Sequence, residues 1–85
     1  MGKVMIEITK GHNQYVLNAD TGLVVTFETA EMLYGMMLVL KRKVAGVTVS
    51  IATLMDDPMN EALEQMHELG IKVIKREDIK VIKHD

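Results

Sequence analysis

The stretch "VTVSIATLMDDPMNEALEQMHELGIKVI", residues 47–74, predicts a strand, a helix and a second strand in succession. Residues 47–53 alternate β-branched side chains with small ones, which is typical of a buried strand. Pro58 suits the first helical position after a cap at Asp57, and Gly70 suits the position just beyond the helix end. We therefore expect a parallel β-α-β crossover unit, which is right-handed in almost all known sheets.

Upstream of this unit, the sequence predicts three antiparallel strands and a first helix. Residues 3–9 alternate apolar and polar side chains, and strands at 15–19 and 23–28 flank the turn-forming segment "NADTG". Thr29 is a good N-cap for a helix over residues 30–43, whose last three residues are basic. Cations there complement the negative end of the helix dipole.

The predicted order β-β-β-α-β-α-β indicates the fold class. We expect an α+β fold, a two-layer sandwich in which two helices cover one face of a mixed sheet of about five strands. A length of 85 residues suits one domain, residues 1–85. The segment "IKVIK" occurs at 71–75 and again at 79–83. The first copy predicts a strand, and the second is either its hairpin partner or a tail along the sheet edge, where lysines discourage aggregation.

Composition argues against several classes of function. The absence of cysteine removes disulfides, iron–sulfur clusters and cysteine-zinc sites. A net charge of −2 and only three aromatic residues, Tyr15, Phe27 and Tyr34, argue against a nucleic-acid partner. The apolar run at 32–40 is too short to span a membrane, and Glu7 interrupts the N-terminal apolar segment. We expect a cytoplasmic protein without a membrane partner.

Catalytic patterns are missing from the sequence. The three histidines, His12, His67 and His84, lie far apart, and Ser50 lacks the glycines of a nucleophile elbow. The six glycines are scattered singly, so no phosphate-binding loop is predicted. We therefore expect no enzymatic activity.

Acidic residues gather at the two places where a strand gives way to a helix. Glu28 and Glu31 flank the first junction, whereas Asp56, Asp57 and Glu61 flank the second. If the strands that precede these junctions run parallel, both junctions lie on one edge of the sheet, where ligands often bind. Carboxylates without cysteine suit Ca²⁺ or Mg²⁺, and flexible loops favour calcium. The alternative is that these residues only cap the helices and complement their dipoles.

The two adjacent aspartates have different expected roles. Asp57, next to Pro58, is the natural cap and is explained by helix initiation. Asp56 is not needed for that cap, and it would face Glu28 and Glu31 if the third and fourth strands were neighbours. From the residues alone, the question is therefore whether Asp56 meets those two glutamates at the sheet edge.

The first helix is apolar nearly all round. Residues 32–34 and 36–40 include three methionines and no charge, whereas a helix that covers one sheet face should have a polar outer side. Helix 30–43 is therefore a candidate surface for a homodimer or another protein partner. The alternative is that it lies centrally, covered by other parts of the chain.

Two resemblances accompany these patterns. The segment "DPMNEALEQMHELGIKVI" resembles the helix and strand of a CBS module, which implies nucleotide binding, although the return strand of that module is replaced by "KREDIKVIKHD". The whole chain, with "TFETAE" and "MDDPMNE", resembles a small hypothetical protein family of methanogenic archaea. That resemblance implies an α+β fold in which two acidic loops bind calcium through Glu28, Glu31, Asp56 and Asp57.

Overall fold

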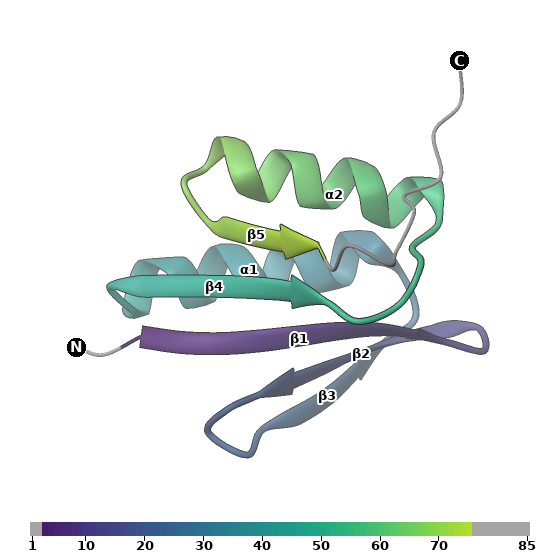
Figure 1. Ribbon diagram of the computed structural model, residues 1–85, viewed down its shortest axis with the longest axis horizontal. Coiled ribbons are helices and arrows are strands. Elements are labelled where there is room, and N and C mark those ends of the chain that lie inside the picture. Colours follow the sequence, from purple (N-terminus) through teal and green to yellow (C-terminus); the bar gives the residue numbers. More distant parts are fainter. Residues whose placement is uncertain (1–2, 76–85) are drawn as a thin grey trace.

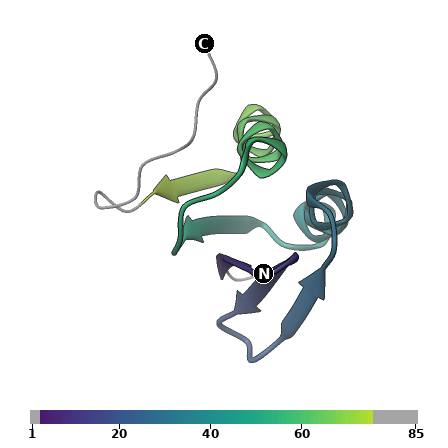
Figure 2. The ribbon, with the colours of Figure 1, turned by 90° about the vertical axis from the view of Figure 1, so that its right-hand side faces the viewer.

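The computed structural model of the chain describes residues 3–75 (Figure 1). Its elements follow the predicted order β-β-β-α-β-α-β. They are β1 (Lys3–Gly11), β2 (Gln14–Ala19), β3 (Val24–Phe27), α1 (Ala30–Lys43), β4 (Gly46–Ile51), α2 (Asp57–Glu68) and β5 (Lys72–Lys75). Both helices lie on the same side of one sheet (Figure 2). The predicted α+β fold class, a sheet layer and a helix layer, is therefore confirmed.

The five strands form one mixed sheet in the order β3-β2-β1-β4-β5. β2 is antiparallel to both of its neighbours, whereas β1, β4 and β5 are mutually parallel. The predicted parallel relation of β4 and β5 is thus confirmed. β3 also runs in the direction of β4, so both strand-to-helix junctions lie on one edge. However, β2 and β1 separate β3 from β4, so the neighbouring arrangement considered for Asp56, Glu28 and Glu31 does not occur.

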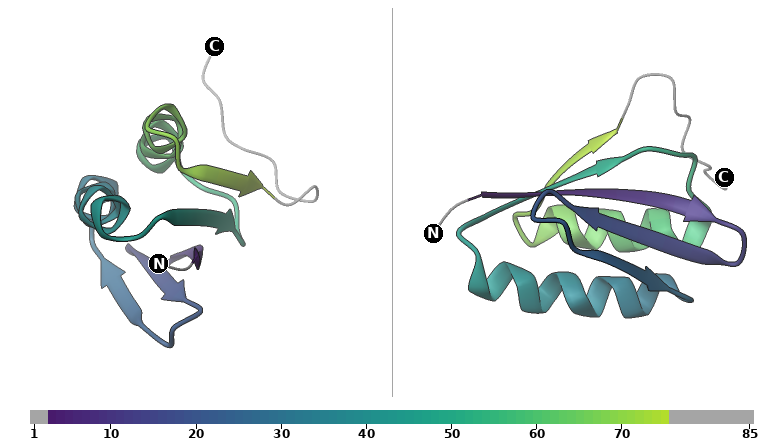
Figure 3. Two further views of the ribbon diagram at one scale, coloured as in Figure 1. Left: turned by 90° about the vertical axis from the view of Figure 1, so that its left-hand side faces the viewer. Right: turned by 90° about the horizontal axis from the view of Figure 1, so that it is seen from below.

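The hydrophobic core lies between the sheet and the two helices. Burial alternates along the central strands β1 and β4. The right-hand view of Figure 3 shows α1 and α2 side by side beneath the sheet. The fully buried side chains include Ile6, Ile8, Leu17, Val49 and Ile51 of the strands and Leu33, Met37, Met59 and Met66 of the helices. Each such side chain contributes about 1.5–3 kcal/mol relative to exposure, so the core fixes where both helices lie.

The two helix starts are capped by side chains. The α1 bounds agree with the predicted helix 30–43, and the Thr29 hydroxyl accepts from the Met32 N–H at 3.2 Å. At α2, the Asp56 carboxylate accepts from the Met59 N–H at 3.3 Å, and Asp57 is already helical. The predicted cap at Asp57 is therefore wrong by one residue. Proline is tolerated throughout a first helical turn, because the N–H groups there have no intrahelical acceptor.

The end of β4 and the position of β5 are the remaining features of the sheet. β4 ends at Ile51, two residues earlier than predicted, yet the chain stays beside β1, because the Ala52 N–H donates to the Ile8 carbonyl at 3.1 Å. Among residues 3–75, β5 is the outermost strand on its side of the sheet, and it exposes Lys72 and Lys75. The second "IKVIK" segment, 79–83, lies outside the described residues. No helix within residues 3–75 has the length and apolar character needed to cross a membrane.

Candidate functional site

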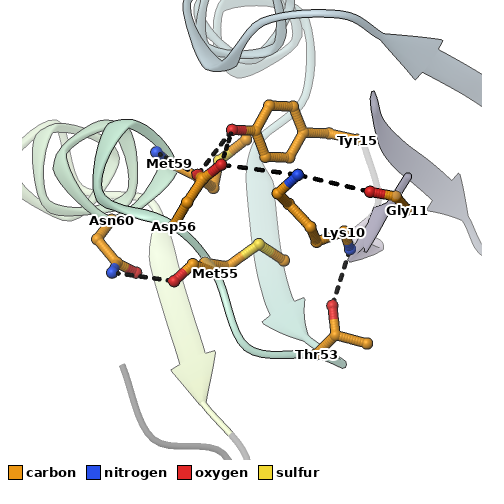
Figure 4. Close-up of polar contacts among 8 residues, drawn as sticks. All are labelled: Lys10, Gly11, Tyr15, Thr53, Met55, Asp56, Met59 and Asn60. Atoms are coloured by element: carbon orange, nitrogen blue, oxygen red, sulfur yellow. Dashed lines mark hydrogen bonds and ion pairs between the residues drawn. The ribbon is translucent and has the colours of Figure 1, made fainter. Parts of the chain in front are cut away.

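A polar cluster of Asp56, Tyr15 and Lys10 lies where β1, β2 and α2 meet (Figure 4). The Tyr15 hydroxyl lies within hydrogen-bond distance of both Asp56 oxygens, 2.7 Å from Oδ1 and 2.8 Å from Oδ2. The Lys10 ammonium lies 3.7 Å from Oδ2 and 5.1 Å from the centre of the Tyr15 ring. Asp56 thus joins the start of α2 to the first hairpin.

The fold brings this cluster together through strand register. Lys10 and Tyr15 are directly opposite each other in the β1–β2 hairpin, so their side chains share the helix-facing side of the sheet. The Lys10 backbone N–H donates to the Thr53 hydroxyl at 2.8 Å, which holds the segment after β4 against the end of β1. Asp56 follows three residues later and is thereby placed over Tyr15.

Tyr15 acts as a hydrogen-bond donor and not as a base. Its side chain is buried, and this burial raises the pKa of its hydroxyl well above the ordinary value of about 10. The hydrogen bond to Asp56 and the negative charge of that carboxylate raise the pKa further, because both favour the neutral phenol. The hydroxyl therefore stays protonated at neutral pH and can donate its hydrogen bond to the Asp56 carboxylate.

A groove of about 650 Å³ lies between the N-terminal parts of α1 and α2. Three exposed glutamates border it: Glu28 and Glu31 at the start of α1 and Glu61 in the first turns of α2. Tyr15 and Gln65 also contribute to its lining. Among the described residues that line the groove, none is a lysine, arginine or histidine. The groove is therefore a locally acidic surface in a chain of net charge −2.

The structure places the four predicted site residues in two groups. Glu28 and Glu31 lie together at the groove, as their sequence positions suggested. Asp56 instead caps α2 and binds Tyr15, and Asp57 is half-buried as the first residue of α2. Within residues 3–75, no three acidic or histidine side chains are arranged to hold a metal ion as they stand.

Three residues of the polar cluster and the groove were not among the predicted site residues: Lys10, Tyr15 and Glu61. Glu61 was recognised at the junction but not assigned to the site, because the packing of α1 against α2 is a long-range feature. Lys10 and Tyr15 were interpreted only as parts of the first hairpin. The sequence signal for this pair is the turn between the two residues, because a tight hairpin around residues 11–14 sets Lys10 opposite Tyr15.

Comparison with known proteins assigns no family to the chain. No protein-family model and no curated protein matches the chain.

Proposed function

We propose that the chain is a small, non-catalytic protein that binds a divalent cation, calcium above all, in the acidic groove. The observation that carries this proposal is that Glu28, Glu31 and Glu61, from two different junctions, border one groove whose described lining contains no cationic side chain. Three carboxylates on one groove give it a negative potential, and such a potential attracts a divalent cation. The ligands would be these three glutamates, with the Gln65 amide oxygen within the same lining.

Calcium suits such a groove better than magnesium. Calcium accepts six to eight oxygen ligands in flexible geometry, whereas magnesium demands a nearly ideal octahedron and sheds its water reluctantly. The exposed glutamate side chains of the groove are free to adapt their rotamers. Both helices begin at the groove, and the positive ends of their dipoles work against a cation. The expected dissociation constant is therefore weak, about 10⁻⁴–10⁻³ M.

Asp56 has a supporting part in this proposal. Its carboxylate is already bound by the Tyr15 hydroxyl, the Met59 N–H and the Lys10 ammonium. We therefore assign it to the placement of α2, and thus of Glu61, beside α1. Direct ligation by Asp56 and Asp57 stays a prediction, which the variants below distinguish from ligation by the glutamates.

Nucleotide binding at the same edge is less well supported. The phosphates of a nucleotide carry negative charge, and the three glutamates at the groove would repel them. The positive helix ends attract anions, but each is worth only about 0.3–1 kcal/mol at an exposed position.

An NMR titration tests the cation site directly. Amide shifts followed during addition of CaCl₂ to 10 mM, at constant ionic strength, should concentrate at residues 28–34 and 58–65 and fit one dissociation constant. The double variant Glu31→Gln/Glu61→Gln should raise that constant at least tenfold, because it removes two of the three carboxylates. A parallel titration with MgCl₂ should give weaker binding.

A matched control separates a site from general counterion attraction. Glu64→Gln/Glu68→Gln removes the same total charge, with both residues in α2, but these residues border a different groove, between α2 and β5. This control should bind calcium as the wild type does, and equal weakening by both double variants would contradict the proposal. Loss of binding in Asp56→Asn, with little change in Glu31→Gln/Glu61→Gln, would instead place the site at Asp56 and Asp57.

A further inference from the structure

The outer flank of α1 carries an apolar stripe that the fold of one chain leaves uncovered. Met32 is 55% exposed and Val39 is 51% exposed. Gly35, which is exposed, and Met36, which is half-buried, lie between them. The spacing i, i+3, i+4, i+7 places all four residues on one side of the helix. We call Met32, Gly35, Met36 and Val39 the α1 stripe.

The α1 stripe faces away from α2. Tyr34 of α1 borders the groove that the two helices share. Successive helical residues are about 100° apart, so Tyr34 lies on roughly the opposite side of the helix from Met32 and Val39. Within the described part of the chain, α2 therefore leaves the stripe open.

Gly35 gives a second, independent indication of an interface. Apart from its chain neighbours and the adjacent backbone of α1, a Cβ at this position would meet no atom of residues 3–75 within 4 Å, so packing between elements does not require glycine there. Glycine in a helix interior costs about 1 kcal/mol relative to alanine. Its use in the middle of an exposed apolar stripe is explained if another backbone approaches closely at this point.

We infer that the α1 stripe binds a second copy of this chain, with the two α1 helices antiparallel about a two-fold axis near Gly35. Charge complementarity favours this occupant. The start of α1 is acidic, with Glu28 and Glu31, and its last turn is basic, with Arg42 and Lys43. An antiparallel pair sets the acidic end of each helix against the basic end of the other. The register that places Met32 opposite Val39 of the second copy also brings Glu28 toward Lys43 of that copy.

The size of the α1 stripe sets the strength of the dimer. A 14-residue helix is about 21 Å long, so a single helix pair offers less than the roughly 800 Å² per partner of a standard stable interface. The dimer is therefore weak, with a dissociation constant of about 10⁻⁵–10⁻³ M. It forms only at high protein concentration and weakens as salt screens the end charges.

Sedimentation equilibrium between 20 μM and 1 mM tests this inference on the full chain. The wild type should shift from the monomer mass of 9.5 kDa toward twice that mass as concentration rises. Gly35→Gln, which fills the close-approach point while favouring the helix, should raise the dissociation constant at least tenfold. Lys43→Glu should also weaken the dimer. Circular dichroism and thermal melts at low concentration should show both variants folded as monomers.

The matched control is Met5→Gln, which removes an exposed methionine from the sheet face opposite the helices, where Met5 is 44% exposed. This variant should dimerise as the wild type does. A monomer at every concentration would overturn the inference. So would a dimer that survives Gly35→Gln and is lost in Met5→Gln, because the open sheet face would then be the interface.

Discussion

Tyr15 and Asp56 form the contact that ties the start of α2 to the first hairpin. The phenol is buried at 5% exposure, whereas the carboxylate remains 36% exposed. Water can therefore replace part of the hydrogen bonding that the Asp56 carboxylate would lose if the Tyr15 hydroxyl were removed. A hydrogen bond to a charged group is worth about 1.5–3 kcal/mol, and partial exposure reduces this to about 1–2 kcal/mol here. Tyr15→Phe should lower the free energy of unfolding by that amount at pH 7.

The raised pKa of Tyr15 makes this stabilisation depend on pH. Because the hydroxyl loses its proton near pH 10 in the unfolded chain but only at higher pH in the folded chain, its contribution is complete below pH 10 and declines above it. The difference in unfolding free energy between the wild type and Tyr15→Phe should therefore shrink as the pH rises from 10 to 11. Urea denaturation of both proteins at each pH measures this difference. A constant difference over this range would contradict the assignment.

At the scale of single elements, substitutions at the N-cap of α2 test which residue begins this helix. Asp56→Ala removes the cap and the partner of Tyr15, and it should cost about 2–3 kcal/mol. Asp56→Ser restores a capping oxygen and should recover about 1 kcal/mol of that loss. Urea denaturation of the two variants measures the difference. If Asp57→Ala proved more destabilising than Asp56→Ala, the cap would lie at Asp57 after all.

Helix and strand bounds were largely predictable because their signals are local. Thr29 and the basic last turn defined α1 to the residue, and Gly70, with a φ of +94°, ends α2 as expected of glycine beyond a helix end. The Asp56 cap was missed because "DDP" offers two acceptable caps one residue apart. Sheet order depends on long-range pairing, so the insertion of β2 and β1 between β3 and β4 had no local signal.

At the scale of the whole molecule, topology explains why the acidic groups meet differently from the prediction. Both helices begin at the same end of the sheet, because β3 and β4 run in the same direction (Figure 1). The two preceding strands are kept apart, but α1 and α2 pack side by side. Glu28 and Glu31 therefore meet Glu61 of α2 across a groove, whereas Asp56 lies at the Tyr15 contact. Helix packing, and not strand pairing, brings the two junctions together.

Cation binding at a groove between both helices should stabilise the whole fold. A ligand that binds only the folded chain adds RT ln(1 + [L]/Kd), which is about 1.4 kcal/mol at 10 mM calcium for a dissociation constant of about 1 mM. For a domain of this size, that corresponds to a rise in Tm of about 6–10 °C. Calorimetry with and without 10 mM CaCl₂, against NaCl of equal ionic strength, measures this increment.

Variants that lack selected glutamates test whether the rise in Tm with calcium comes from binding at the groove. Glu31→Gln/Glu61→Gln should melt close to the wild-type temperature without calcium, because both side chains are exposed and surface substitutions change stability little. The same variant should gain little when calcium is added, since its remaining carboxylate binds weakly. Glu64→Gln/Glu68→Gln should keep the full calcium increment. Equal increments in all three proteins would mean that calcium acts on the general negative charge, and the groove would then have no special affinity.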